Sequence, residues 1–356
     1  PGGIKIIRIS DEKTLARITD NLKIKYSNNG ENIVSAKINK KKSEGFFDTL
    51  NKEFDFKNKI YVLDNLISSD NSFTRNFIDK LHKSIFFEDK NIISDIKIID
   101  YDYIINLAGI ASPYYYNKFP LETIEVNTKG LVNMLNLAQK TNAKIIYFSS
   151  SEIYGNPDQS NIPTNEQYNG NVSSYGSRSC YDESKRLGET LCYVYHHSLK
   201  VNLNIVRPFN VYGPGMSKYD YRVMPNFMSK MLNNEECEVY SDGKQTRTYC
   251  YISDAIEGFI RTMLLGESGK IYNIGNDSPE LSILDLCEIF KKISPSNFSY
   301  KKIKYPDVYP SDEPRRRCPD ISLAKKDLNY LPKIQIEDGL KYFIDWSTAN
   351  FVNEEI

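Results

Sequence analysis

The chain has 356 residues, enough to bury one large hydrophobic core or two coupled ones. Its 46 lysines and arginines balance its 46 aspartates and glutamates, so its charge gives no reason to expect a nucleic-acid or membrane partner. The six cysteines form no C-x-x-C pair and no apolar run is long enough to span a bilayer, which predicts a cytoplasmic protein. The three histidines lack partners at metal-ligand spacing, so we expect no metal site.

Short apolar runs alternate with longer amphipathic segments over the first two thirds of the chain. Segments 120–140 and 181–199 carry apolar residues at helical spacing. Nearly continuous apolar strands between such helices are typical of a sheet covered on both faces. The alternation therefore predicts an α/β fold with a doubly wound parallel sheet. Five runs are expected to form its strands: 32–36, 60–63, 103–107, 144–148 and 202–206.

Beyond about residue 212 the pattern becomes irregular, with glycine and proline breaks and several tyrosines. We interpret this part as a smaller, discontinuous substrate-binding lobe. The expected parts are an N-terminal extension at 1–30, a Rossmann-like dinucleotide-binding domain at 31–211 and 248–265, and the lobe at 212–247 and 266–346.

Strand 60–63 ends in Asp64, an acid placed to accept hydrogen bonds from an adenosine ribose, although a turn aspartate would look the same. A glycine-rich turn should lie roughly 20 residues earlier in a dinucleotide fold. The window 37–43 has no glycine, and Gly45 does not restore the motif. Its lysines could contact phosphate as point charges or form a solvated loop. Retention and loss of a bound dinucleotide are therefore both open.

A serine-rich strand end at 149–151 leads into Glu152 and precedes Tyr181 and Lys185. A free tyrosine, with a pKa of about 10, is a poor base at neutral pH. A lysine one helical turn later lies on the same face and can stabilise the phenolate. A hydroxyl at a neighbouring strand end could complete a relay to a substrate alcohol. The spacing alone also fits a packed tyrosine and a solvated lysine.

Residues 31–346 resemble the extended short-chain dehydrogenase/reductase family of nucleotide-sugar enzymes, most closely its UDP-glucuronate decarboxylase branch. The matching strings include Tyr116 and lie in family order: L-A-G-I-A-S-P at 107–113, P-L-E-T-I-E-V-N-T at 120–128, S-S-S-E-I-Y-G-N-P at 149–157, R-S-C-Y-D-E-S-K-R at 178–186, D-G-K-Q-T-R-T-Y at 242–249 and E-P-R-R-R-C-P-D-I at 313–321.

The resemblance implies oxidation of the sugar C4 hydroxyl by tightly held NAD, loss of CO2 from the 4-keto acid, and return of the hydride. It makes Tyr181 the base at O4, with Lys185 lowering its pKa and holding the nicotinamide ribose. Ser150 matches the hydroxyl that binds O4, and Glu152 the acid that assists decarboxylation and reprotonation. Ser151 replaces the aspartic acid of 4,6-dehydratases, which favours decarboxylation over dehydration.

The resemblance also implies a set of binding residues. Arg317 matches an arginine that contacts the substrate near its carboxylate or diphosphate, and it joins the catalytic set. One departure is Gly215, where the family usually has arginine. The cofactor contacts implied are Asp64, Asp89, Leu107, Tyr181 and Lys185. The substrate contacts implied are Ser112, Tyr116, Asn210, Arg222, Arg247 and Arg317.

Three functions follow from these patterns. The first is decarboxylation of UDP-glucuronate to UDP-xylose with internally recycled NAD. The second is a non-catalytic nucleotide-sugar-binding homologue that has lost NAD, because 37–43 lacks glycine and Gly215 replaces a cation. The third is a nucleotide-sugar 4-epimerase. A homodimer through segments 120–140 and 181–199 is expected, since both carry apolar residues on more than one face.

Overall fold

The protein was analysed as a computed structural model. The window 37–43, where a dinucleotide fold would place its glycine-rich turn, lies outside the described residues. The structure describes residues 4–8, 25–26, 33–35, 59–68, 85–97, 100–294, 298–305 and 314–351, with positions 74, 78–79, 81 and 83.

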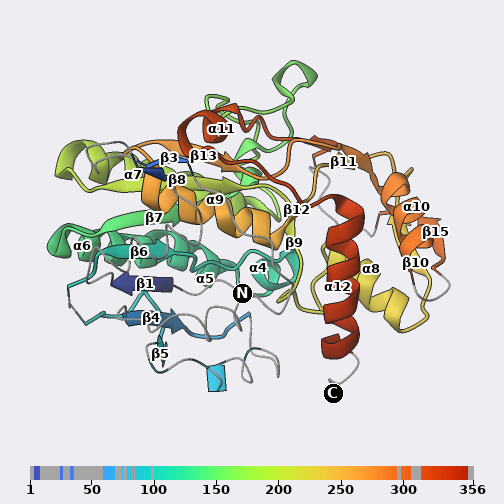
Figure 1. The fold of residues 1–356 in the computed structure, drawn as a ribbon, viewed down its shortest axis with the longest axis horizontal. Helices are drawn as coiled ribbons and strands as arrows, with labels where there is room; N and C mark the ends of the chain where they lie inside the picture. The colour runs from blue at the N-terminus through green and yellow to red at the C-terminus, as the bar shows by residue number, and fades with distance from the viewer. Residues whose placement is uncertain are drawn as a thin grey trace.

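A seven-stranded sheet forms the centre of the larger domain (Figure 1). Strand β1 runs antiparallel to both of its neighbours, and the other six strands are parallel to one another. The parallel, doubly wound sheet predicted from the sequence is thus interrupted by one reversed strand. The strands in spatial order are β13 (Ile271–Ile274), β8 (Leu203–Pro208), β7 (Lys144–Phe148), β6 (Tyr103–Asn106), β1 (Ile4–Arg8), β4 (Lys59–Asp64) and β5 (Ile85–Asp89).

The prediction that 32–36 supplies the first strand of this sheet is wrong. Strand β3 (Ile33–Ser35) pairs with β2 (Lys25–Tyr26) in a separate two-stranded sheet. The place between β4 and β6 is taken by β1, which the sequence assigned to an N-terminal extension. Both runs have strand propensity, but propensity does not specify which neighbour a strand will pair with.

Helices cover both faces of the sheet, and the alternation of side chains along β7 shows how. Ile145 and Tyr147 join the core under α6 (Leu131–Thr141) and α7 (Ser179–Leu199). Ile146 and Phe148 point the other way, into the core under α9 (Ile252–Leu265) and α11 (Ser322–Leu328). Successive side chains of a strand face opposite sides, so a strand covered on both faces must be apolar throughout.

The helical segment predicted at 120–140 consists of three consecutive pieces. Helix α5 (Pro120–Glu125) leads into a π-helical turn, η1 (Val126–Gly130), and then into α6. Gly130 permits a close approach here, because a Cβ would lie 2.7 Å from the Cδ1 atom of Ile92. The short helix α4 (Pro113–Lys118) comes just before, and the 3-10 turns η2 (Ser151–Tyr154) and η3 (Gln159–Asn161) follow β7.

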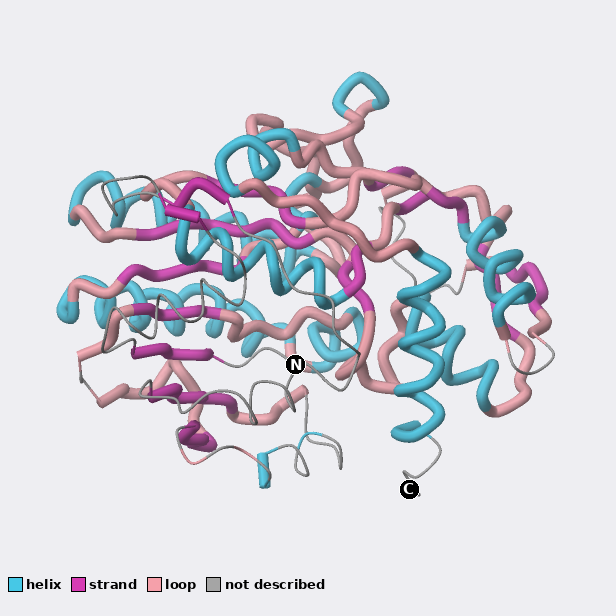
Figure 2. Tube along the Cα trace, viewed as in Figure 1, coloured by secondary structure: helices cyan, strands magenta, loops and turns pink. Residues whose placement is uncertain are grey.

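The smaller lobe packs around its own hydrophobic core. Figure 2 shows its helices grouped beside the open end of the sheet. Its helices are α8 (Val223–Leu232), α10 (Ile283–Ile293) and α12 (Ile336–Phe351). Its short strands are β9 (Val211–Tyr212) with β12 (Cys250–Tyr251), β10 (Cys237–Tyr240) with β15 (Tyr300–Ile303), and β11 (Thr246–Arg247) between β14 (Leu281–Ser282) and β16 (Arg316–Arg317).

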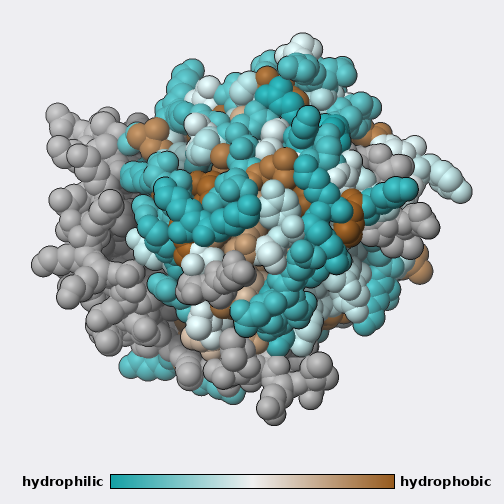
Figure 3. Space-filling view, turned by 90° about the vertical axis from the view of Figure 1, so that its right-hand side faces the viewer, coloured by the Kyte–Doolittle hydropathy of each residue, from teal (hydrophilic) through white to brown (hydrophobic). Residues whose placement is uncertain are grey.

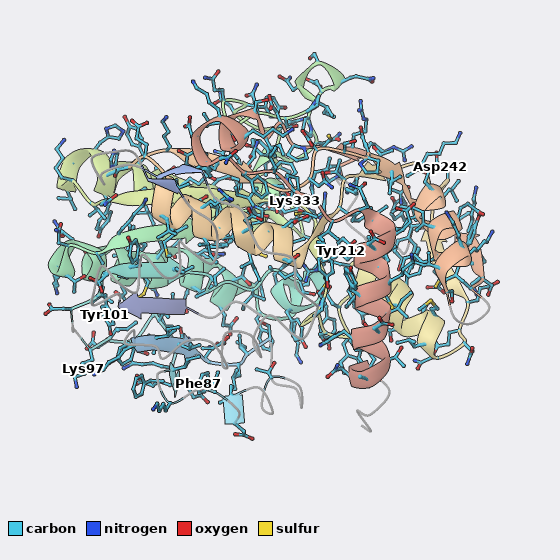
Figure 4. All side chains as sticks on the ribbon, in the orientation of Figure 1. Phe87, Lys97, Tyr101, Tyr212, Asp242 and Lys333 are labelled. Carbon is cyan, nitrogen blue, oxygen red and sulfur yellow. The ribbon has the colours of Figure 1, made fainter. Side chains whose placement is uncertain are left out.

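The boundary between the two parts differs from the predicted one. Strand β13 and helix α11 belong to the sheet domain, although the sequence places 266–346 in the lobe. Tyr212, labelled in Figure 4, fastens β9 to α12 within the lobe, since its hydroxyl donates to the Ile336 carbonyl at 3.4 Å. Gly339 makes room for it, because a Cβ there would lie 2.2 Å from that hydroxyl.

The surface of the lobe end is mostly hydrophilic, with scattered hydrophobic patches (Figure 3). Among the helices of the described ranges, none combines the length and apolar character that crossing a bilayer requires.

Candidate active site

The site begins where β7 ends. Ser150 directly precedes η2 and caps it, its Oγ accepting a hydrogen bond from the Glu152 backbone at 3.2 Å. The same side chain lies near enough to the Tyr181 hydroxyl on α7 to lower the pKa of that phenol. A serine at the carboxyl end of a parallel strand is thereby placed beside a tyrosine near the start of a helix. This edge of the sheet is where open α/β folds bind ligands.

Tyr181 is buried, and its ring stacks on Tyr116 with centroids 5.4 Å apart. Burial raises the pKa of Tyr181 to about 12, although the neighbouring Ser150 side chain lowers it. Lys185, one turn along the helix, donates from Nζ to the Phe148 carbonyl at 2.8 Å and lies 5.9 Å from the centre of the Tyr181 ring. Burial lowers the pKa of Lys185 to about 7. Additional positive charge beside the pair would favour the phenolate.

Glu152 is held by arginines from two other elements. Arg317 of β16 pairs with it in bidentate fashion, with Nη2 2.7 Å from Oε2, and Arg178 also bonds Oε2. Partial burial raises the pKa of the Glu152 carboxyl, but the two guanidinium groups outweigh burial and hold the pKa at about 2. Glu152 is therefore a carboxylate at neutral pH, with both oxygens occupied.

Four arginines converge on this region although the chain has no net charge. Arg247 joins Arg178 and Arg317 in lowering the pKa of Glu152. Arg222 lies within electrostatic reach of Glu152 and Tyr181. A cluster of cations at one end of a sheet suits a ligand with several negative charges.

The predicted substrate contacts near the sheet are brought together. The Ser112 hydroxyl donates to Asp220 at 3.4 Å, and the other oxygen of Asp220 accepts from Arg222 Nε at 2.8 Å. Tyr116 underlies Tyr181, and its buried hydroxyl has no hydrogen-bond partner among the described atoms.

Two predicted substrate contacts have another task in the structure. The Asn210 amide donates to the Thr248 carbonyl at 2.8 Å, and Asn210 itself has a positive φ of 41°. Arg247 donates to the carbonyls of Thr246 and Pro314, each at 2.8 Å. These side chains therefore hold main chain in place beside the arginine cluster.

Two of the five predicted cofactor residues lie at the ends of β4 and β5. Asp64 and Asp89 are register partners there. The Asp64 carboxylate accepts from the Leu66 backbone at 2.9 Å, and burial raises its pKa. Asp89 is exposed, and Leu107 packs partly buried against the core under α9.

A pocket lies along this edge of the sheet. Asp64, Lys90, Asn91, Gly109 and Ile110 contribute to its lining. Gly109, in the pocket lining, lets the main chain pass close to Lys185. A Cβ built on this glycine would lie 3.1 Å from the Nζ atom of Lys185. A strand-end acid, a glycine at the point of close approach and a buried lysine fit a dinucleotide.

Sequence reasoning missed Arg178, Asp182 and Asp220. Arg178 and Asp182 are four residues apart, and Arg178 Nε lies 3.4 Å from Asp182 Oδ2. Both fall inside the string R-S-C-Y-D-E-S-K-R, so an i,i+4 search for ion pairs would have found them. Asp220 stands two residues before Arg222, where no helical or strand period marks it.

A second cavity, of about 250 Å³, lies beside Glu152. Its walls come from the segment after η2, from residues 171–173, from the start of α7 and from the residue two positions before β16. The lining residues are Glu152, Gly155, Asn156, Asn171, Val172, Ser173, Arg178, Asp182 and Pro314.

Gly215, which stands where the resembling family usually has arginine, lies in the lobe. It has a φ of +93°, and a Cβ built on it would meet nothing within 4 Å. Space for a side chain is therefore present, but the backbone conformation is one that favours glycine.

The sequence model of the NAD dependent epimerase/dehydratase family matches residues 49–275, beginning after the window 37–43. UDP-glucuronic acid decarboxylase 3 of Arabidopsis thaliana is 38% identical over 284 residues, 80% of this chain and 80% of that protein. UDP-glucuronic acid decarboxylase 1 of Xenopus tropicalis is 38% identical over 248 residues, 70% of this chain and 57% of that protein.

Solved structures share the fold. A UDP-glucuronic acid 4-epimerase from Bacillus cereus, in complex with UDP-glucuronic acid and NAD, is 26% identical with a TM-score of 0.66, covering 80% of this chain and 89% of that one. A dTDP-glucose 4,6-dehydratase from Streptomyces venezuelae, with NAD and TYD bound, is 22% identical with a TM-score of 0.70, covering 82% and 87%. The Rossmann-like α/β architecture predicted from the sequence is confirmed.

Proposed function

The chain belongs to the NAD dependent epimerase/dehydratase family, and from that premise we propose that it converts UDP-glucuronate into UDP-xylose and CO2. The observation that carries the proposal is the Arg178–Glu152–Arg317 cluster beside the neighbouring side chains of Ser150 and Tyr181. A redox-assisted acid/base pair and a carboxylate-binding group then share one site. The relatives at 38% identity over most of the chain are named for this reaction.

Tyr181 and Ser150 are placed to handle the proton of the sugar O4. Tyr181 accepts that proton while the Ser150 hydroxyl orients O4, and Tyr181 returns the proton at the end of the cycle. Lys185 favours the phenolate through its charge when protonated. NAD, when bound, supplies a reversible hydride acceptor for C4. Asp64, Gly109, Tyr181 and Lys185 are the residues that we expect to hold it.

The arginine cluster is placed to bind the carboxylate of the substrate. Oxidation at C4 turns UDP-glucuronate into a β-keto acid, whose C5–C6 bond breaks with its electrons delocalised onto O4. Arg317 has the planar fork that pairs with a carboxylate, and Arg178 lies beside it on the same Glu152. Ser151 is buried at 3% exposure and carries no acid, so the proton donor that dehydratases use is missing at that position.

The two alternatives are less well supported. Loss of catalysis would be expected to disperse the Ser150–Tyr181–Lys185 arrangement, which is assembled here. Epimerisation at C4 shares the same first step and has a structural relative at 26% identity. The relatives that share 38% identity with this chain are named for decarboxylation, which favours that reaction over epimerisation.

The experiment that tests the proposal mixes the purified chain with UDP-glucuronate and NAD and follows CO2 and sugar products by NMR. We expect CO2 and UDP-xylose. A folded protein that yields UDP-galacturonate would identify a 4-epimerase, and one that yields no product would overturn the enzymatic assignment.

We also propose a homodimer through α5 and α7. Both helices expose apolar side chains: Leu121, at 72% exposure, and Ile124 on α5, with Leu187, Tyr193 and Val194 on α7. The two helices already contact each other within the chain, so a second copy could complete a four-helix bundle. Light scattering should give twice the chain mass, and Leu121→Arg should halve it, whereas Leu331→Arg, on a different exposed site, should not.

The cytoplasmic location inferred from the sequence is supported by the cysteines. All six are free thiols, and five of them are buried. Unpaired buried thiols are typical of proteins that fold in a reducing compartment.

A further inference from the structure

The proposed reaction consumes one proton in each turnover, and the Ser150–Tyr181 relay does not supply it. Cleavage of C5–C6 releases CO2 and leaves an electron pair on C5 that must be protonated to give xylose. The proton that Tyr181 takes from O4 is returned to O4 when the ketone is reduced. A second proton must therefore reach C5 from solvent in every turnover, and this inference rests on the decarboxylation proposed above.

Glu152 is poorly suited to deliver that proton in the arrangement seen here. Its two oxygens accept from Arg317, and Oε2 also accepts from Arg178. A carboxylate whose pKa is held at about 2 by two guanidinium groups carries almost no proton at neutral pH. Another acid near C5 has to supply it.

Asp182 differs from Glu152 in its burial and in the hydrogen bonds of its carboxyl oxygens. It follows Tyr181 on α7 and is 4% exposed. Its Oδ2 has a long contact of 3.4 Å with Arg178 Nε, and its buried Oδ1 accepts no hydrogen bond from the described atoms. A buried carboxyl oxygen without a partner is costly unless it is protonated or bonded to water.

The cavity of about 250 Å³ supplies the place for that water. Asp182, Glu152 and Arg178 share its wall, with the polar side chains of Asn156 and Asn171. A polar cavity of this size holds several water molecules. It reaches from Glu152 to Asp182 in the first turn of α7, the residue that follows Tyr181.

We propose that Asp182, acting through water in this cavity, supplies the proton that C5 takes after CO2 has left. The C5–C6 bond breaks, its electrons pass to C5 and O4, and CO2 departs. A cavity water then protonates C5 and is itself reprotonated by Asp182. The Asp182 carboxylate is stabilised beside Arg178 until solvent returns a proton through the cavity.

The charges around Asp182 agree with this role. Burial and the neighbouring Glu152 carboxylate raise the pKa of Asp182 to about 7, against the opposing effect of Arg178 and Arg317. Tyr116, Cys180 and Tyr181 also face Asp182 electrostatically. A group with a pKa near neutrality can both donate a proton and recover it within one turnover.

The test compares Asp182→Asn with Glu183→Gln. The second variant makes the same change at the next residue, where the carboxylate meets Arg186 at the surface. We expect D182N to lower kcat by roughly 100-fold, the lower end of the range for loss of a proton donor. Because CO2 release is irreversible and precedes protonation of C5, kcat/KM should be unchanged. E183Q should match the unmodified protein, and Asp182→Glu should recover part of kcat.

Two results would overturn the inference. One is a D182N kcat within twofold of the unmodified protein. The other is an equal fall of kcat and kcat/KM, which would mean that Asp182 positions Arg178 and Glu152 before cleavage. A solvent deuterium effect on kcat that increases in D182N is the further expected sign, since proton delivery to C5 would then limit turnover.

A readout without turnover separates this inference from the proposed function. Infrared titration of the ligand-free protein should show one protonated carboxyl that ionises around neutral pH and is missing in D182N. Absence of that band overturns the inference even where UDP-glucuronate is decarboxylated. Failure of the unmodified chain to release CO2 would instead remove the proposed function, and with it the proton that Asp182 is inferred to supply.

Discussion

The sugar end and the adenosine end of the proposed site are built in different ways. At the sugar end, Tyr181, Lys185 and Glu152 are each tied to another element: to Ser150, to the Phe148 carbonyl and to Arg317. At the adenosine end, Asp64 accepts from the backbone two residues further along. Chemistry therefore depends on tertiary side-chain pairs, whereas cofactor binding depends on strand ends and main chain.

The contrast predicts that single changes at the sugar end will reduce turnover, and that changes at the adenosine end will mainly weaken binding. The largest effect is expected for Tyr181→Phe, which removes the hydroxyl and leaves the stacked ring. CO2 release should fall by about 10²- to 10⁴-fold, as for loss of a general acid–base group. Tyr175→Phe, at a tyrosine 96% exposed, is the matched control and should keep full activity.

Glu152→Gln should come next. The amide leaves Arg178 and Arg317 without their shared anion, so we expect substrate to bind with both guanidinium groups misaligned. The rate of CO2 release should fall about 100-fold, within the range of electrostatic contributions to catalysis. Glu288→Gln, at an exposed glutamate paired with Lys291, serves as the control. An unchanged rate in E152Q would show that the cluster is not part of the chemistry.

The same carboxylate should leave a mark on stability against pH. Its folded pKa of about 2 lies below the ordinary value of 4.5, so its stabilising effect is complete above pH 4.5 and is lost as the pH falls toward 2. Denaturant titrations at several pH values should show a shallower acid-side loss in E152Q than in the unmodified protein. Parallel curves would contradict the ion-pair description.

Arg178→Lys sharpens the comparison within the sugar end. Lysine keeps the charge but cannot span Glu152 and Asp182 with a planar fork. We expect roughly a 10-fold loss of kcat/KM for UDP-glucuronate, about 1.4 kcal/mol of transition-state stabilisation. Arg186→Lys, two turns further along α7, should have no such effect.

The smallest effect on turnover is expected at the adenosine end. Asp64→Asn should weaken NAD binding about 10-fold, the scale of one charge-assisted hydrogen bond. The rate of CO2 release at saturating NAD should stay the same. Calorimetry with NAD and turnover assays will separate the two quantities, with the exposed Asp95→Asn as control. A large loss of kcat in D64N would break the proposed division.

Much of the fold could be predicted because four strands and two helices have strong patterns. The runs at 60–63, 103–107, 144–148 and 202–206 form β4, β6, β7 and β8. The reversed strand β1 and the return of β13 to the sheet were not predicted. A short apolar run reports its strand propensity, whereas its partner and direction are decided by the rest of the sheet.

The site residues also fall into two groups, those that local sequence patterns predict and those that they do not. Tyr181 and Lys185 lie one turn apart on a helix, and Ser150 sits at a strand end, so local spacing indicates their meeting. Arg178 and Arg317 reach Glu152 from 26 and 165 residues away. Such pairs depend on how η2, α7 and β16 approach one another, which no local period encodes.

The most direct test of the central claim uses UDP-glucuronate labelled with ¹³C in its carboxyl group. The account predicts that labelled CO2 and UDP-xylose form in equal amounts, that C5 of the product acquires hydrogen from solvent, and that NAD is not consumed. A folded, NAD-loaded protein that retains the label in a sugar product, or leaves the substrate unchanged, would contradict it.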